Sequence, residues 1–198
     1  MAATDTTSTT LSWFLLYISL HPGVQEKLFE EIESKIGNSR LPSLRDRPLC
    51  HYAEAVIHET LRYSSMVSMG GIRRVTDDVQ DFHGYFIPKD TLMISNLWGA
   101  HFNPELWDEP QKFNPSRFLD STGKFKKSDN LLAFSAGRRN CLGEGIARDQ
   151  LFLYVTALIQ RFKVSYPEGE KPQVVPVPSL VLIPAPFRLI FQDRFGAK

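Results

Sequence analysis

Hydrophobic residues recur at helical spacing through the first third of the chain, which predicts three α-helices. We expect an apolar-rich helix over residues 4–20 that ends at His21-Pro22, where the proline suits the first turn of a second helix. In that second helix an apolar residue recurs every four positions over residues 24–36, and Gly37 ends it. A third helix is expected after Pro48. Its buried face should consist of Leu49, Tyr52, Ala53, Val56, Ile57 and Leu61.

The middle of the chain changes to a pattern of short strands and loops. After Gly70-Gly71, β-like runs are expected at 72–76, 84–87 and 91–95, separated by glycine, proline and aspartate. Residues 103–134 form a predicted loop in which prolines alternate with aromatic residues. A loop of this length inside a compact domain usually serves a function or wraps around something.

The last third of the chain predicts one further helix and an extended tail. The helix should begin after Gly143 and run to about Phe162, and the tail should contain extended pieces at 174–177 and 180–183. The predicted fold class is therefore mainly α with minor β. The residues expected to face the core from the helix are Ile146, Leu151, Val155, Leu158 and Phe162.

Composition limits the classes of protein to which the chain can belong. With 198 residues, a net charge of +1, 42% hydrophobic residues and 23% charged residues, it fits one globular domain or a piece of a larger one. This balance excludes a disordered tail, a collagen-like fibre and a strongly basic nucleic-acid binder. Two cysteines cannot build a disulfide framework, so a reducing compartment is the default expectation.

Targeting and metal-binding patterns are missing from the sequence. No positively charged region follows Met1, and the apolar run 13–18 is far shorter than the ~20 residues that a membrane helix needs. We therefore expect the run to lie in a buried core helix. No phosphate loop, zinc pattern or Gly-x-Ser-x-Gly elbow occurs. Without metal-ligand spacing, a structural role is expected for His21, His51, His58, His83 and His101.

The strongest chemical signal is the segment 134–143, Phe-Ser-Ala-Gly-Arg-Arg-Asn-Cys-Leu-Gly. It predicts a tight loop that delivers Cys141 to the N-terminus of a helix, where the helix dipole and free N–H groups stabilise a thiolate. Arg138-Arg139 add positive charge, and Gly137 and Gly143 let a large flat group approach the backbone. Such a sulfur suits an iron ligand. The alternative is a plain buried cysteine beside two surface arginines.

The spacing of this segment resembles the heme-binding loop Phe-x-x-Gly-x-Arg-x-Cys-x-Gly of the cytochromes P-450. Its defining residues are all present, namely Phe134, Gly137, Arg139, Cys141 and Gly143. The resemblance implies a b-type heme whose iron is bound by Cys141, with Arg139 on a heme propionate. In such a site the thiolate pushes electron density into the iron and favours O–O cleavage.

A second matching element is the pair Glu59 and Arg62 on the third predicted helix. An i,i+3 pair lies on one helix face and can form a charge-assisted hydrogen bond, although many such pairs are solvated surface salt bridges. The pair resembles the Glu-x-x-Arg helix of the same family. In the family a further arginine joins this pair in a network. Arg117 resembles it, within the segment 115–118, where Ser116 replaces the usual glutamate. The resemblance implies that the three residues lock the helix to the loop that positions the heme.

The N-terminal residues 2–7, Ala-Ala-Thr-Asp-Thr-Thr, look like the distal helix motif of the family. The resemblance implies that Asp5 and Thr6 are catalytic residues that relay protons toward dioxygen through hydrogen-bonded water. Ala3 stands where the family has a glycine, and its methyl group would narrow the oxygen pocket. The alternative is that Thr4 or Asp5 only caps a helix.

Residues 66–71 follow the Glu-x-x-Arg helix at the place where the family has a substrate-contacting loop. An ordinary turn is the alternative for this segment. Arg73 and Arg74 fall where the family has a basic residue on a heme propionate, and we prefer Arg73 for this contact. Two adjacent arginines on the surface are the alternative.

The resemblance covers nearly all of residues 1–198 and is closest to the microsomal family 2 enzymes. It implies the C-terminal portion of a single catalytic domain, with the N-terminal half and the membrane anchor absent. It also implies a monooxygenase that inserts one oxygen atom of O2 into a small apolar substrate, such as a fatty acid or a xenobiotic. Electrons would come from NADPH through a flavoprotein reductase partner. The full-length parent would lie in the endoplasmic reticulum membrane, held only by the missing N-terminal part.

Two other functions stay open at this point. A truncated chain could bind heme without turnover or stay inactive, because the family's N-terminal half supplies much of the substrate pocket. A heme-thiolate isomerase or sensor would need no proton relay, and the pair Asp5 and Thr6 argues mildly against it.

Overall fold

The computed structural model describes residues 2–179 and 181–196, and its described part is mainly helical. The α-helices are α1 (Ala2–Leu20), α2 (Pro22–Lys35), α3 (His51–Ser64), α4 (Leu97–Phe102) and α5 (Glu144–Arg161). Short 3-10 helices are η1 (Arg47–Leu49), η2 (Pro115–Phe118) and η3 (Gly137–Arg139). The strands are β1 (Arg73–Arg74), β2 (Val79–Phe82), β3 (Tyr85–Ile87), β4 (Leu92–Met93), β5 (Phe162–Ser165), β6 (Pro176–Val177), β7 (Ile183–Pro184) and β8 (Ile190–Asp193).

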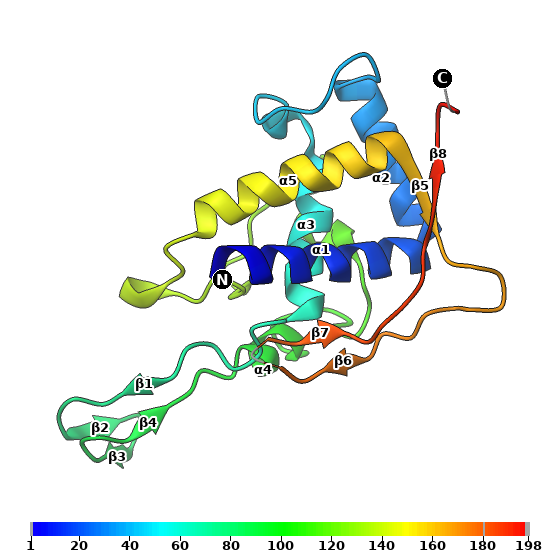
Figure 1. The fold of residues 1–198 in the computed structure, drawn as a ribbon. Helices are drawn as coiled ribbons and strands as arrows, with labels where there is room; N and C mark the ends of the chain where they lie inside the picture. Colours follow the sequence, from blue (N-terminus) through cyan, green and yellow to red (C-terminus); the bar gives the residue numbers. More distant parts are fainter. Residues whose placement is uncertain (1, 180, 197–198) are drawn as a thin grey trace.

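Four helices enclose the main core of the protein. Figure 1 shows α1 and α5 running across the molecule, with α3 crossing them and α2 at one end. Their apolar faces meet in one cluster, which includes Phe14 and Ile18 of α1, Ile32 of α2, Val56 of α3 and Phe152 of α5, each at most 1% exposed. This packing fixes the N-terminal end of α5, and therefore the loop before it, relative to α3.

The strands form small antiparallel pairs around the helical body. The pairs within the described residues are β1 with β4, β2 with β3, β5 with β8, and β6 with β7. Figure 1 shows the chain from β1 to β4 reaching away from the helices as a long arm, while β7 lies beside α1. The expected fold class, mainly α with minor β, is confirmed.

All four predicted helices are present as α1, α2, α3 and α5, but two expected core positions are wrong. Leu49 is 52% exposed because it lies in η1, before Cys50, where the chain turns into α3. Ile146 is 67% exposed because it lies on the face of α5 opposite the buried residues Leu151 and Val155. The expected buried run at 13–18 is confirmed, since five of its six side chains are at most 1% exposed.

The middle and the tail depart more from the expected pattern. The strand-like runs shrink to the two or three residues of β1, β3 and β4, whereas β2 and α4 were not predicted. The loop at 103–134 is confirmed as largely irregular, with η2 and a single bridge between Leu119 and Phe125 as its regular parts. In the tail the helix ends at Arg161 and β5 begins at Phe162. Leu180, expected to start an extended piece, lies outside the described residues.

None of the helices formed by residues 2–179 and 181–196 combines the length and hydrophobicity that a bilayer requires.

Candidate cofactor-binding site

The cysteine loop is held by its own backbone. The chain turns at Ser135 and Gly137, which have φ angles of 62° and 73°, before the 3-10 turn η3. Glycine suits the second position because the left-handed region disfavours side chains. The backbone N–H of Cys141 then donates to the carbonyl of Phe134 over 2.8 Å, which closes the loop. Cys141 therefore stands two residues before Gly143, the N-cap of α5.

The two cysteines of the chain occupy opposite environments. Cys141 is exposed, whereas Cys50 is fully buried, and both thiols are free. Burial raises the pKa of the Cys50 thiol to about 12, which keeps it protonated and unreactive. The alternative of a plain buried cysteine thus fits Cys50 and not Cys141.

The two glycines of the loop differ in what surrounds them. A Cβ atom placed on Gly137 would meet no atom within 4 Å. A Cβ atom on Gly143 would lie 3.9 Å from Sγ of Cys141, in contact with the thiol. This distance is an ordinary van der Waals contact, so Gly143 lies directly beside the sulfur that the loop presents.

A cleft opens beside the loop and has mainly apolar walls. It encloses about 890 Å³ between α1, α3, α5 and the loops, part of it open to solvent. Its lining includes five of the eight predicted catalytic and cofactor-binding residues, namely Thr6, Arg73, Phe134, Arg139 and Cys141, but not Asp5, Gly137 or Gly143. Met66 also lines it. An apolar cleft with few polar groups is the usual form of a site for a cofactor or small molecule.

The distal motif reaches the cleft through Thr6. Thr6 lines the cleft together with Thr7 and Thr10 on the same face of α1, whereas Asp5 is exposed and does not line it. Thr4 and Asp5 lie inside α1, so neither precedes the helix as an N-cap. Asp5 lies in the first turn, where a negative charge interacts favourably with the helix dipole. The side chain of Ala3 lies outside the described part.

The two candidate propionate partners separate clearly. Arg73 lines the cleft, and its Nη2 donates to the carbonyl of Arg139 over 3.4 Å, so the two arginines lie together at one side of the cleft. Arg74 instead pairs with Asp90 over 3.1 Å on the exposed arm. From the 66–71 segment, four residues line the cleft, namely Met66, Val67, Gly70 and Gly71.

The residues around the cleft fit a heme group on three chemical grounds. A free exposed sulfur supplies a metal ligand, two guanidinium groups suit the carboxylates of the propionates, and the apolar walls suit a flat hydrophobic ring. Cys141 would hold the iron, and Arg73 and Arg139 would hold the propionates.

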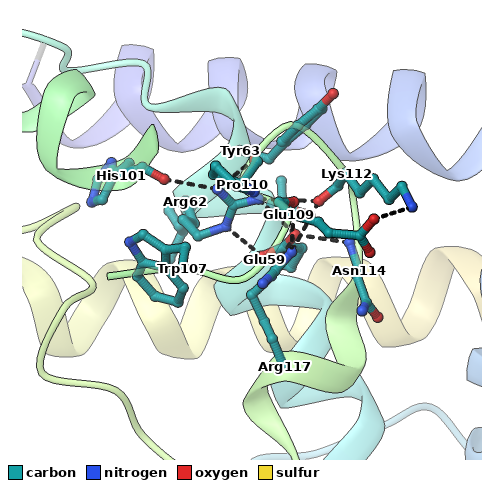
Figure 2. Close-up of polar contacts among 12 residues, drawn as sticks. Glu59, Arg62, Tyr63, His101, Trp107, Glu109, Pro110, Lys112, Asn114 and Arg117 are labelled. Carbon is teal, nitrogen blue, oxygen red and sulfur yellow. Dashed lines mark hydrogen bonds and ion pairs between the residues drawn. The ribbon is translucent and has the colours of Figure 1, made fainter. Parts of the chain in front are cut away.

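Glu59, Arg62 and Arg117 form a buried ion-pair network beside this cleft (Figure 2). Arg62 donates from Nε and Nη2 to the two carboxylate oxygens of Glu59 over 2.7 and 2.8 Å, and both side chains are 0% exposed. Arg117 donates from Nε to Oε1 of Glu59 over 3.2 Å. The pair is therefore a bidentate buried contact and not a solvated surface salt bridge.

The remaining donors of the network hold the irregular chain at 101–114. Arg62 also donates to three backbone carbonyl oxygens, those of His101, Pro110 and Lys112. The Arg117 guanidinium donates to those of Asp108, Glu109 and Lys112, while the N–H of Asn114 donates to Glu59. Arg62 of α3 and Arg117 of η2 thus satisfy the polar backbone of a loop that has little secondary structure of its own.

Two buried histidines, His58 and His101, make hydrogen bonds that the sequence pattern does not predict. His58 and His101 are at most 1% exposed and are bonded at both ring nitrogens. Burial, followed by the positive charge of Arg148, lowers the pKa of His58 to about 3. Burial, followed by Arg62, lowers the pKa of His101 to about 4. Both histidines are therefore neutral at pH 7.

Arg148 connects α3 to the cysteine loop. On α5 it pairs with Glu144 over 2.8 Å, donates to Nε2 of His58, and lies 5.3 Å over the ring of Phe134. Phe134 begins the loop that ends at Cys141. Arg148 of α5 therefore contacts both His58 on α3 and Phe134 at the start of the cysteine loop.

Comparison with known proteins identifies the family. The family model described as Cytochrome P450 matches residues 1–191. The chain is 41% identical to cytochrome P450 2U1 of Bos taurus over 194 residues, which cover 98% of this chain and 36% of that protein. It is 42% identical to cytochrome P450 2J5 of Mus musculus over 189 residues, with coverages of 96% and 37%. The chain belongs to the cytochrome P450 family.

The chain spans just over a third of the length of these relatives. Membership of the family implies heme as the cofactor. The helices and small antiparallel sheets are consistent with part of the P450 fold.

Proposed function

We propose that this chain carries the heme-thiolate side of a monooxygenase that inserts one oxygen atom of O2 into a small apolar substrate, with Cys141 as the iron ligand. The observation that supports it most strongly is the exposed Cys141 thiol in the same apolar cleft as Arg73, Arg139 and Thr6. Bound heme would supply the activation of dioxygen, which no protein side chain provides.

The protein groups would bind and orient the heme and would deliver protons. Cys141 stands two residues before the N-cap of α5, so the positive end of the helix dipole would lie near its sulfur. The apolar walls at Phe134, Leu61 and Leu151 keep water away from the bound group. Thr6 would hold a water and pass a proton from its Oγ1 to the cleft, and the exposed Asp5 would resupply that proton from solvent.

The wider assignments rest on the family and its resemblance to microsomal members. We propose a flavoprotein reductase that passes electrons from NADPH, a substrate of the fatty-acid or xenobiotic class, and a location at the endoplasmic reticulum. The segment 66–71 is proposed to touch the substrate, because four of its residues line the cleft. A second candidate is heme binding without turnover, which is favoured by the exposed position of Asp5 outside the cleft lining.

Replacing Cys141 with alanine is expected to abolish thiolate ligation. The wild-type chain with added heme, reduced under carbon monoxide, should give the red-shifted Soret band of thiolate-bound iron, and Cys141→Ala should lose it. Cys50→Ala is the matched control, because Cys50 is buried away from the cleft, and it should keep the band. A wild-type chain that takes up no heme would contradict the proposal. Heme uptake without NADPH consumption in the presence of a reductase and a fatty acid would favour the second candidate.

Arg73 and Arg74 form an internal test of the propionate assignment. Arg73→Gln is expected to weaken heme binding about tenfold, because it removes a charge-assisted contact with a carboxylate. Arg74→Gln should leave the affinity within about twofold, because Arg74 lies on the exposed arm and pairs with Asp90. Titration of each variant with heme, followed at the Soret band, measures both. Equal losses in the two variants would show that only total charge matters.

A further inference from the structure

His101 lies between two walls of the cleft and is bonded to both. Its ring Nε2 accepts the backbone N–H of Leu132 over 3.0 Å, and its Nδ1 lies 2.9 Å from Oγ of Ser65. Ser65 begins one wall, which continues through Met66, and Leu132 leads into the other, which continues through Phe134. The ring itself lines the cleft and is 1% exposed.

The bonding pattern fixes the protonation of the ring. Because Leu132 donates to Nε2, that nitrogen carries a lone pair, so the ring proton lies on Nδ1 and is donated to Ser65. A third link comes from Arg62, which donates to the His101 backbone carbonyl over 2.8 Å. One residue thus joins the buried ion-pair network to both walls.

Each of the two ring partners holds a strained turn. Ser65 ends α3 in the left-handed region with φ 38°, an uncommon conformation for a residue with a side chain. The carbonyl of Leu132 accepts the N–H of Ser135 over 2.8 Å. This turn holds Ser135 in the left-handed region, within the loop that leads to Cys141. Removing the ring would release both turns at once.

We propose that His101 is a positioning residue that sets the spacing between the wall from Ser65 and the segment that leads into the cysteine loop. It would keep Phe134, whose carbonyl accepts the N–H of Cys141, at a fixed place relative to α3. The role deepens the proposed function, but its first test needs no heme.

Amide hydrogen exchange in the heme-free chain tests the link directly. His101→Ala should raise the exchange rate of the Leu132 amide at least about tenfold, because that N–H loses its acceptor. His101→Gln should hold the rate within about threefold of wild type, since an amide can accept from Leu132 and donate to Ser65. If His101→Ala does not fold, His101→Leu takes its place, because leucine fills the site without accepting a hydrogen bond.

Gln25→Ala is the matched control for general destabilisation. Gln25 is 2% exposed and bonds in both directions with the backbone of Val164, between α2 and β5 and outside the cleft lining. Gln25→Ala should raise the exchange rate of the Val164 amide. It should change the exchange rate of the Leu132 amide by no more than any loss of global stability explains. Equal effects of Gln25→Ala and His101→Ala on Leu132 would overturn the proposal, as would no change at Leu132 in His101→Ala.

The heme-loaded chain gives a second, spectroscopic test. Under carbon monoxide, His101→Ala should lower the fraction of thiolate-bound iron at least about threefold, whereas Gln25→Ala and His101→Gln should leave it near wild type. An unchanged fraction in His101→Ala would refute positioning of the ligand loop. A wild-type chain that binds no heme would refute the proposed function instead, and the exchange measurement would still decide the role of His101.

Discussion

Glu59→Ala is expected to lower the free energy of unfolding by about 3–5 kcal/mol, because it leaves the fully buried Arg62 guanidinium without its counter-charge. Single domains are stable by only about 5–15 kcal/mol, so the variant should be largely unfolded or sharply destabilised. Urea unfolding followed by circular dichroism at 222 nm measures the change. Arg117, 9% exposed in its side chain, would also lose its carboxylate partner.

Glu109→Ala supplies the control for this prediction. Glu109 pairs with Lys112 within the loop that the network holds, but both side chains are more than half exposed. Its loss should cost less than about 1 kcal/mol, as is usual for exposed ion pairs. A Glu59→Ala variant within 1 kcal/mol of wild type, or equal to Glu109→Ala, would show that the buried network adds little to stability.

The chemistry of the site could be predicted further than its geometry. The cysteine loop is predicted from residues at most nine positions apart, from Phe134 to Gly143, whose turn is set by local backbone conformation. The pair of Glu59 and Arg62 follows from helix periodicity, because residues three apart share one helix face. Local sequence patterns therefore predict the site residues whose partners are close in sequence.

Partners far apart in sequence could not be predicted in this way. The carbonyl groups that accept from Arg62 belong to His101 in the short helix α4 and to Pro110 and Lys112 in the following loop, about 39–50 positions away. Loop conformation depends on packing. The same limit hid His101, whose ring contacts residues 31 and 36 positions away. The short helix α4 was missed because its six residues are too few for a helical period to be recognised.

Errors at the ends of helices have a simpler cause. Leu49 fits the apolar spacing of α3, but Pro48 and Cys50 place it in η1 before the helix begins. Ile146 was counted as a core residue because it is apolar, although the period of 3.6 residues puts it opposite Leu151. A hydrophobic residue near a helix terminus needs its phase checked against the buried face, because apolar side chains are common on surfaces too.

Lowering the pH from about 7.5 to about 5 is expected to reduce the free energy of unfolding by about 4 kcal/mol, with His58 and His101 as the cause. Their pKa values are about 3 and about 4 in the folded chain, below the ordinary value of 6.5. In this interval the unfolded chain binds two protons that the folded chain does not, so stability falls as the pH falls. Positive charges near His58 come from Arg148, Arg47 and Lys127, and they oppose its protonation further.

The interval separates the histidines from the carboxylates. Asp46 accepts hydrogen bonds from Arg40 that hold its pKa below the usual value, so its contribution to stability begins to fall only below about pH 4. Urea unfolding at the two pH values gives the change, and His101→Gln should remove about half of it, because glutamine does not titrate. NMR titration that finds both histidines with pKa values near 6.5, or equal stabilities at the two pH values, would contradict the burial argument. A halved pH dependence in His101→Gln would instead assign about 2 kcal/mol of the loss to the ring that joins the two walls of the cleft.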